Sequence, residues 1–333
     1  MVWYEEEGKI MEFFSKGKIY HFMKYSRFFV FTTLVLAILS LVLVAVKGFS
    51  YGIDFAGGTV VQVKYETPAP IDKIRQSMAT DKLFAGAQIT EFGSPEEVVI
   101  RFATASDSVG QDVGDHIREL LKNTGKFEIR KVDIVGPKIG SELRERGIIS
   151  AILAMIGILI YVTIRFEWKF AIASIITLAH DIAITLGAII LFDIEISLDV
   201  LAAILTLIGY SLNDTIIIFD RIREELVETK NMNFYEIIDI CVSKTLSRTT
   251  ITSLLVFFVV LTLYLFGGEI IHGFSFTMLL GVIIGTYSSI FISAPFLTLI
   301  GFSVEKYKAR VALREKNRIE REKMRSMYEK GTV

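Results

Sequence analysis

The sequence is poor in the residues that build disulfide frameworks and metal centres. It has one cysteine, Cys241, in a chain of 333 residues, so neither a disulfide framework nor a cysteine-based metal site is available. Its four histidines are widely scattered, at positions 21, 116, 180 and 272. Because metal sites group histidine with other ligands at short spacings, we expect neither a metal centre nor a cofactor.

Charged residues are absent from long stretches of the chain. The mean hydropathy is +0.51 and 52% of the residues are hydrophobic, while the 22% that are charged cluster between apolar runs. A helix of about 20 apolar residues crosses a bilayer. The sequence therefore predicts a polytopic α-helical membrane protein with six spans, at residues 28–46, 148–164, 170–192, 200–219, 251–266 and 274–300. The last run is long enough to tilt or break.

Basic residues precede the first apolar run, as they do in a signal peptide. The run is too long for the core of a signal peptide and has no clean small-residue cleavage site after it. We therefore retain it as a membrane helix.

Lysine and arginine are missing from two of the short loops, residues 193–199 and 267–273. Short loops rich in these residues stay in the cytoplasm. Lysine and arginine precede the first span, and they also lie between spans two and three and between spans four and five. The sequence thus predicts a cytoplasmic N-terminal segment at 1–27, an outside segment at 47–146, helices two to six within 147–301, and a cytoplasmic tail at 302–333. That tail carries ten Lys or Arg against five Glu. It is interpreted as a solvated extension, with a ribosomal or lipid contact as the alternative.

The outside segment has the pattern of a small soluble domain. Strands are predicted at 59–65, 87–91, 97–102 and 126–134, and helices at 70–78 and 108–122. The order βαββαβ predicts a ferredoxin-like α+β domain. This fold names no function, and we find no catalytic constellation in it, so a binding or mechanical module is expected.

Two of the predicted spans contain a carboxylate. A charge at the centre of a membrane helix costs about 2.5 to 3.5 kcal/mol on insertion scales, so it is rare without a partner or a function. Residues three or four apart share a helix face. Asp214 then shares a face with Thr206 and Tyr210, with Gly209 and Asn213 beside them. Asp181 follows His180 near mid-bilayer and forms a second stripe with Ser174, Thr177 and Thr185.

Arg248 enters span five from the cytoplasmic side, and Thr252 lies one turn further along. We expect Arg248 to meet Asp214 at a similar depth. The pair is interpreted either as an anchor that fixes helix packing or as part of a proton relay. In a relay, burial favours the protonated carboxyl, a nearby arginine favours the ionised form, and a conformational change alternates the two. Sodium stays open as the coupling ion, because hydroxyl and carboxyl oxygens suit it.

Two pairs of glycines stand out. Gly281 and Gly285 form a G-x-x-x-G pattern in the sixth span, which predicts close helix contact, and Pro295 beyond them permits a kink. Gly57 and Gly58 lie where the chain enters the outside domain. They are interpreted as a hinge or a close backbone approach, with a plain turn as the alternative.

Five ordered motifs resemble the SecF family of bacterial protein translocase subunits, which is part of the RND superfamily. They are GIDFAGGT at 52–59, VGPKIGSEL at 135–143, His180-Asp181, GYSLNDT at 209–215 with FDRIRE at 219–224, and SRTT at 247–250. The resemblance runs from the first span to the end of the sixth.

The resemblance implies an RND-type half-transporter with SecD as a separate chain. It implies a location in the bacterial cytoplasmic (inner) membrane and use of the proton-motive force to draw preproteins from the SecYEG translocon, with YajC and YidC as further candidate partners. Asp214 matches the family's intramembrane aspartate, Arg248 its arginine, and Asp181 its His-Asp pair. Unfolded preprotein and membrane lipids are expected ligands, and no nucleic-acid partner or enzymatic activity is expected.

Two alternatives are weighed against this function. An RND-type exporter half for lipids or small molecules would use the same relay, but it should have a larger outside domain that lines a cavity. An intramembrane aspartyl protease would use Asp181 and Asp214 as a paired acid and base. The segment GYSLND lacks the Gly-x-Gly-Asp arrangement of such proteases, and an arginine would hold one carboxylate ionised.

Overall fold

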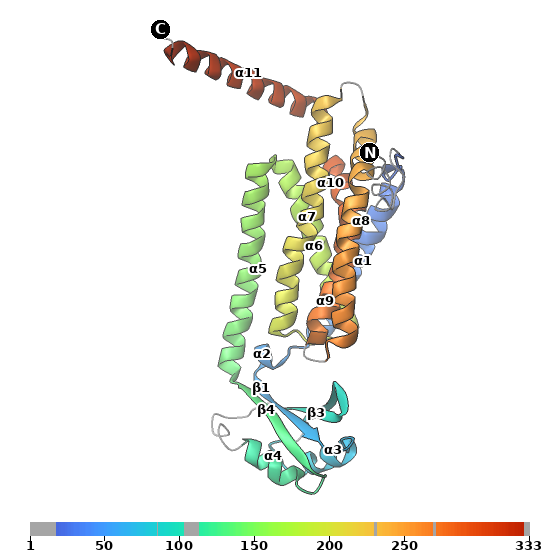
Figure 1. The fold of residues 1–333 in the computed structure, drawn as a ribbon, viewed down its shortest axis with the longest axis vertical. Coiled ribbons are helices and arrows are strands. Elements are labelled where there is room, and N and C mark those ends of the chain that lie inside the picture. Colours follow the sequence, from blue (N-terminus) through green and yellow to red (C-terminus); the bar gives the residue numbers. More distant parts are fainter. Residues whose placement is uncertain (1–17, 85, 103–112, 230–231, 269–270, 330–333) are drawn as a thin grey trace, which may run out of the picture.

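The computed structural model describes residues 18–84, 86–102, 113–229, 232–268 and 271–329 (Figure 1). Six of the described helices are long and apolar enough to cross a membrane, as predicted. They are α1 (Ser26–Lys47), α5 (Pro137–Arg165), α6 (Trp168–Leu191), α7 (Leu198–Glu228), α8 (Phe234–Phe266) and α9 (His272–Phe291). The protein is therefore a multi-pass membrane protein with a small α+β domain at one end of its bundle. We call that end the sheet end and the opposite end the tail end.

Three of the spans extend well beyond the predicted apolar runs. Helix α5 begins before its run, α7 continues to Glu228, and α8 begins at Phe234, where Asn233 and Glu236 form a capping box. Hydropathy detects only the apolar part of a helix, whereas these polar turns continue the same helices outside the apolar layer. The helices at the tail end consequently project beyond the membrane.

The sixth span is broken. Helix α9 ends at Phe291, and the chain resumes as α10 (Ser293–Leu299). Pro295 has no N–H to donate to the carbonyl of Phe291 four residues earlier, and its ring crowds that carbonyl. The single run predicted at 274–300 is thus two helices.

The domain at the sheet end has the predicted βαββαβ order. Its elements are β1 (Gly58–Tyr65), α3 (Ile71–Ala79), β2 (Gln88–Phe92), β3 (Ser94–Phe102), α4 (Val113–Leu121) and β4 (Phe127–Val135). The strands lie in the order β2-β3-β1-β4, and each neighbouring pair is antiparallel. This is the ferredoxin-like arrangement. Residues 108–112 of the predicted second helix lie outside the described residues.

Alternation along the two central strands gives this domain its core. Val61 and Val63 of β1 and Val98 and Ile100 of β3 are fully buried, because every second side chain of a strand faces the same side of the sheet. They pack beneath the two helices with Ile74, Met78, Ile117 and Leu121. The domain therefore has a core independent of the membrane helices.

A short helix, α2 (Ile53–Ala56), connects α1 to this domain and was not predicted. The Asp54 carboxylate accepts a hydrogen bond from the backbone N–H of Leu198, the first residue of α7, at 2.9 Å. The backbone N–H of Gly52 donates to the carbonyl of Ile196 at 2.9 Å. These bonds fix the entrance of the domain to the loop between α6 and α7.

The glycine pair follows α2 immediately. Gly57 has φ of 76°, and Gly58 has φ of 147° as the first residue of β1. A Cβ atom at Gly58 would lie 2.9 Å from the carbonyl oxygen of Phe102 on the neighbouring strand. Of the interpretations given to this pair, close backbone approach accounts for Gly58.

We expect Gly58→Ala to destabilise the protein by about 1 to 3 kcal/mol, because the methyl group meets a backbone oxygen and the backbone angle is unfavourable for an L-residue. The midpoint of thermal unfolding of the detergent-purified chain measures this effect. Gly136→Ala is the matched control, because Gly136 has φ of −66° and no atom within 4 Å of its ideal Cβ. Equal unfolding midpoints for the two variants would contradict the expectation.

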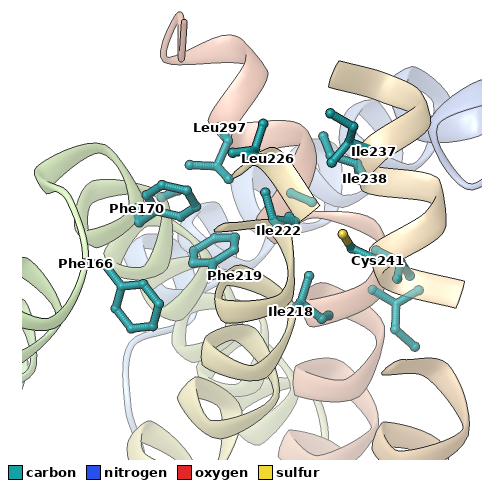
Figure 2. Close-up of a cluster of buried hydrophobic side chains, with 14 of the residues drawn as sticks. Phe166, Phe170, Ile218, Phe219, Ile222, Leu226, Ile237, Ile238, Cys241 and Leu297 are labelled. Atoms are coloured by element: carbon teal, nitrogen blue, oxygen red, sulfur yellow. The ribbon is translucent and has the colours of Figure 1, made fainter. Parts of the chain in front are cut away.

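The largest apolar cluster of the bundle lies toward its tail end (Figure 2). Phe170 of α6 packs edge-on against Phe219 of α7, with ring centroids 5.2 Å apart. The cluster also contains Ile222 and Leu226 of α7, Ile237 and Cys241 of α8, and Leu297 of α10. The cluster packs these helices together between Asp214 and the tail end of the bundle.

Candidate functional site

Polar side chains from five helices gather in the apolar part of the bundle. Asp181 of α6 is 5% exposed and Asp214 of α7 is 3% exposed. Their hydrogen-bond partners lie on α1, α7, α8 and α9. We call this group, with the residues that it contacts, the central polar layer.

Asp181 is fully engaged by its neighbours. One carboxylate oxygen accepts hydrogen bonds from the Ser211 hydroxyl at 2.5 Å and from the Ser288 hydroxyl at 2.8 Å. The other oxygen lies 2.9 Å from Nδ1 of His180, and the far ring nitrogen of His180 is hydrogen-bonded to the Thr33 hydroxyl of α1. Hydrogen bonds to a buried carboxylate offset the cost of removing it from water. Asp181 thereby ties α6 to α7 and α9, and His180 ties it to α1.

The other polar residues of the α6 stripe are buried but do not reach neighbouring helices. The hydroxyls of Ser174, Thr177 and Thr185 each donate to the backbone carbonyl four residues earlier in α6. Of this stripe, Asp181 is therefore the group with direct bonds to other helices.

Asp214 has far fewer partners. It accepts one side-chain hydrogen bond in the described residues, from the Ser253 hydroxyl of α8 at 3.2 Å. The Tyr210 hydroxyl, one turn earlier on α7, is buried near the Ser253 hydroxyl but makes no hydrogen bond of good geometry within the described chain. The hydroxyl of Thr249, one turn before Ser253 on α8, is also buried and makes no such bond in the described residues. A buried polar group without a partner costs about 1 to 3 kcal/mol, so this end of the layer suits a bound water or cation.

The predicted pairing of Arg248 with Asp214 does not form as a contact. Arg248 is exposed on α8, and no ion pair joins it to Asp214 in the part of the chain that the structure describes. Arg248 precedes Ser253 by five residues, so its side chain points about 140° around the helix from the one that faces Asp214. The guanidinium is close enough for a Coulombic interaction with Asp214. Its influence on the carboxylate is thus exerted without a direct bond.

The predicted α7 stripe divides between two environments. Thr206 is exposed, Tyr210 is half-buried and Asp214 is buried. A step of four residues turns a helix by 40° beyond a full turn, so two such steps carry the chain from the surface to the interior. Asn213 and Gly209 lie on the exposed side, as do Thr252 and Arg248 of the adjacent helix. We call these exposed residues of α7 and α8 the open polar face.

Close contact between α7 and α9 depends on the two glycines, as the G-x-x-x-G pattern predicts. A Cβ atom at Gly281 would lie 2.2 Å from the Leu207 side chain, and one at Gly285 would lie 3.2 Å from Cβ of Ser211. Gly285 therefore fixes how near the Ser211 hydroxyl comes to Asp181.

Several members of the layer were not assigned a role from the sequence. Ser211, Ser253, Ser288 and Thr33 lie on four different helices, and isolated hydroxyls in apolar helices commonly bond to their own backbone. The sequence signal that could have identified them is their spacing from other residues of the layer. Ser211 precedes Asp214 by one turn, and Ser288 follows Gly285 by three residues.

Within the described ranges, no three His, Cys, Asp or Glu side chains are grouped as metal ligands. Asp181 and Asp214 accept hydrogen bonds from different residues, and no bond in those ranges joins the two carboxylates. An aspartyl protease holds one proton between two adjacent carboxylates, and Asp181 and Asp214 are not arranged in this way.

The chain matches models of protein-export families. The model described as "Protein export membrane protein SecD/SecF, C-terminal" matches residues 116–305, and the model described as "SecD/SecF GG Motif" matches residues 42–69. The second match contains Gly57 and Gly58.

Proteins named SecF are similar to this chain along nearly their whole length. The protein translocase subunit SecF of Helicobacter pylori strain 26695 is 50% identical over 323 residues, which are 97% of this chain and 100% of the relative. The protein of the same name from Escherichia coli O157:H7 is 38% identical over 291 residues, which cover 86% of this chain and 90% of the relative.

Solved structures are similar as well. The crystal structure of SecDF, a translocon-associated membrane protein from Thermus thermophilus, matches with a TM-score of 0.76 and 33% identity. The match covers 85% of this chain and 39% of that one. A second SecDF structure matches with a TM-score of 0.65 and 31% identity, over 91% of this chain and 41% of its own. This chain thus spans less than half the length of the solved SecDF chains.

Proposed function

Because this chain belongs to the SecF family of protein translocase subunits, we propose that it acts with SecD to drive preprotein export by the proton-motive force. The work is done at the bacterial cytoplasmic membrane, and it promotes release of the preprotein on the outer face. In this role the chain moves a polypeptide and catalyses no covalent chemistry.

The observation that carries this proposal is the contrast between the two buried carboxylates. Asp181 is engaged by three side chains, whereas Asp214 holds one hydrogen bond, at 3.2 Å, beside two buried hydroxyls that make no hydrogen bond of good geometry in the described residues. An under-satisfied carboxylate in an apolar helix bundle is stable when protonated and costly when ionised. Its charge therefore responds to small changes in its surroundings, which is what a proton carrier requires.

A relay through the layer follows from this contrast. Asp214 takes up and releases the proton, Arg248 favours its ionised form from a distance, and Asp181 is the second station. Ser211 donates to Asp181 and lies one turn from Asp214 on α7, so it is placed between the two stations. Each proton that crosses the membrane supplies about 2.3 kcal/mol per 100 mV.

The orientation proposed for the chain places both termini in the cytoplasm. Arg165, Lys169 and Arg221 lie at the tail end, and short loops rich in such residues stay inside. The sheet end and its ferredoxin-like domain are then outside, where an emerging preprotein would be contacted.

SecD is proposed as a separate chain that covers the open polar face. Asn213, Arg248 and Thr252 are exposed there, and such groups are unfavourable against lipid tails. SecYEG is proposed as the translocon that the pair serves, with YajC and YidC as further candidates. Copurification from native membranes tests this assembly. Recovery of the chain without SecD, as a homo-oligomer, would contradict it.

The coupling ion is tested in inverted membrane vesicles that contain SecD, SecYEG and this chain. We expect preprotein import into the vesicles to be stimulated by an imposed pH gradient and membrane potential in sodium-free buffer. Stimulation that requires sodium and persists without a pH gradient would assign the site beside Asp214 to that ion instead.

The charge of Arg248 should matter more than its shape. We expect Arg248→Lys to retain most of the gradient-dependent stimulation, because the guanidinium of Arg248 makes no bidentate contact with Asp214 that lysine would lose. Arg248→Gln should reduce the stimulation at least tenfold, the equivalent of about 1.4 kcal/mol. The vesicle assay measures both variants. Equal activity of Arg248→Gln and the unaltered chain would leave Arg248 as a helix-end anchor.

A further inference from the structure

The last described helix, α11 (Val304–Glu329), is held to the bundle only at its base. Tyr307 is buried in the tail-end cluster, Arg310 forms an ion pair with Glu167 at 2.8 Å, and Lys308 donates to the carbonyl of Thr229. From residue 312 to residue 329 every residue is exposed. Ion pairs three and four residues apart, such as Arg318 with Glu315, support the helix along this part, and the ion pairs of this part within the described chain all lie inside α11.

The base of α11 is at the level where the bundle leaves the membrane. Glu167 is the residue immediately before α6, and the next residue, Trp168, is 52% exposed, as tryptophan commonly is at the membrane interface. From there α11 runs sideways, away from the bundle axis, and not along it (Figure 1). The exposed part, about 27 Å long at 1.5 Å per residue, therefore extends to the side beyond the tail end of the bundle, past the end of α5 (Figure 1).

The exposed part of α11 has distinct faces. Four of its five large exposed apolar side chains, Leu313, Met324, Met327 and Tyr328, project to one side and are between 42% and 68% exposed, while Ile319 lies on another side. Met324, Met327 and Tyr328 follow Leu313 by 11, 14 and 15 residues, which places each of them within about 60° of Leu313 around the helix. The one acid on this side, Glu320, is paired with Lys316 at 3.9 Å.

Basic residues flank the apolar side along both edges. Arg314, Arg321 and Arg325 lie along one edge at spacings of seven and four residues, and none of them forms an ion pair within the described chain. Lys316 and Lys323 lie along the other edge. Glu315 and Glu322 occupy the opposite face, where they bind Arg318 at 2.8 and 3.7 Å. An apolar strip edged by cations with acids opposite is the pattern of a helix that lies in a membrane interface.

We propose that α11 lies on the anionic surface of the membrane that holds the bundle. Its apolar side enters the headgroup region, and Arg314, Arg321 and Arg325 bind lipid phosphates. An arginine fork matches a phosphate group bidentately. The helix would hold the tail end of the bundle against the membrane plane.

The arrangement of charges favours a membrane over a nucleic acid. A helix that binds a phosphate backbone in solution has no use for exposed leucine, methionine and tyrosine on the side that its cations flank. A membrane uses both, because apolar contact and attraction to anionic lipids add.

The test uses the full chain in lipid nanodiscs, with a fluorophore attached to Met324→Cys on the apolar side. Ile319→Cys is the matched control, since five residues turn the label by about 140° on the same helix. Cys241 is buried and gives little background labelling. Quenching by lipids that carry a nitroxide near the headgroup is compared in phosphatidylcholine with and without phosphatidylglycerol.

We expect stronger quenching at position 324 than at 319, and a clear increase with phosphatidylglycerol. Replacing Arg314, Arg321 and Arg325 by Gln should lower the ratio of bound to free helix roughly fivefold for each charge. The double variant Glu315→Gln and Glu322→Gln, on the opposite face, should leave the ratio unchanged or raise it. Equal quenching at both labels or in both lipids would overturn the proposal. Protection of position 324 by added ribosomes, without a response to phosphatidylglycerol, would overturn it in favour of RNA.

Discussion

Asp214→Asn is expected to abolish the stimulation of preprotein export by the proton-motive force. The amide preserves the size of the side chain and can still accept the Ser253 hydrogen bond, but it cannot release a proton. The driving energy lost is about 2.3 kcal/mol per proton at 100 mV, which corresponds to roughly fiftyfold in a coupled equilibrium. Import into inverted vesicles, measured with and without an ionophore that collapses the gradient, gives the stimulated fraction.

Two controls separate this effect from misfolding. Asp199→Asn changes an exposed carboxylate near the start of the same helix and should leave stimulation intact. The Asp214→Asn variant should insert into the membrane normally and still copurify with SecD, because the substitution removes a titratable group and leaves the packing contacts of the side chain in place. Full stimulation in Asp214→Asn vesicles would disprove the proton role of Asp214.

Gly187→Leu is expected to separate α1 from α6 and to destabilise the bundle by more than about 3 kcal/mol, the upper range for overpacking a helix contact. A Cβ atom at Gly187 would lie 2.3 Å from the Ser40 hydroxyl oxygen and 2.8 Å from the Ser40 Cα. Because the second of these is backbone, no rotation of a side chain relieves the clash. The smaller change Gly187→Ala should show part of the same loss.

The contact at Gly187 is continuous with the central polar layer. Ser40 follows Thr33 by seven residues on α1, and Gly187 follows His180 by seven on α6, so both pairs belong to one helix interface. Gly187→Leu should therefore also break the bond between Thr33 and His180 and reduce gradient-dependent export. Thermal unfolding and the vesicle assay measure the two effects.

Gly157 of α5 is the matched control, since no atom lies within 4 Å of its ideal Cβ. Gly157→Leu should unfold at or above the temperature of the unaltered chain, because leucine favours a helix more than glycine does. If Gly187→Leu and Gly157→Leu unfold alike, the close approach of α1 and α6 does not contribute to stability.

Features that depend on neighbouring residues in the chain were predictable. Six apolar runs set the spans, alternation set the strands of the βαββαβ domain, and Pro295 marked the point where the sixth span breaks. Hydropathy also identified Asp214 and Asp181 as carboxylates at membrane depth. The motifs around them indicated the family before any geometry was known.

Features that depend on rotation about helix axes were not predictable. Asp214 and Arg248 have suitable depths, yet Arg248 points about 140° away from the residue of α8 that contacts Asp214. The contact is made by Ser253, and Asp181 is held by Ser211 and Ser288 from two other helices. Nothing local to those serines distinguishes them from hydroxyls that bond to their own backbone.

By itself, then, the sequence determined that this chain spans a membrane six times, carries a small α+β domain and buries two carboxylates, because hydropathy and periodicity are local properties. The tertiary structure alone decided that Asp181 is saturated with hydrogen bonds while Asp214 is not. That difference arises from how α1, α8 and α9 pack around α6 and α7, and packing brings together residues that are far apart in the chain. This difference in hydrogen bonding is the reason for proposing Asp214 as the carboxylate that takes up and releases the proton.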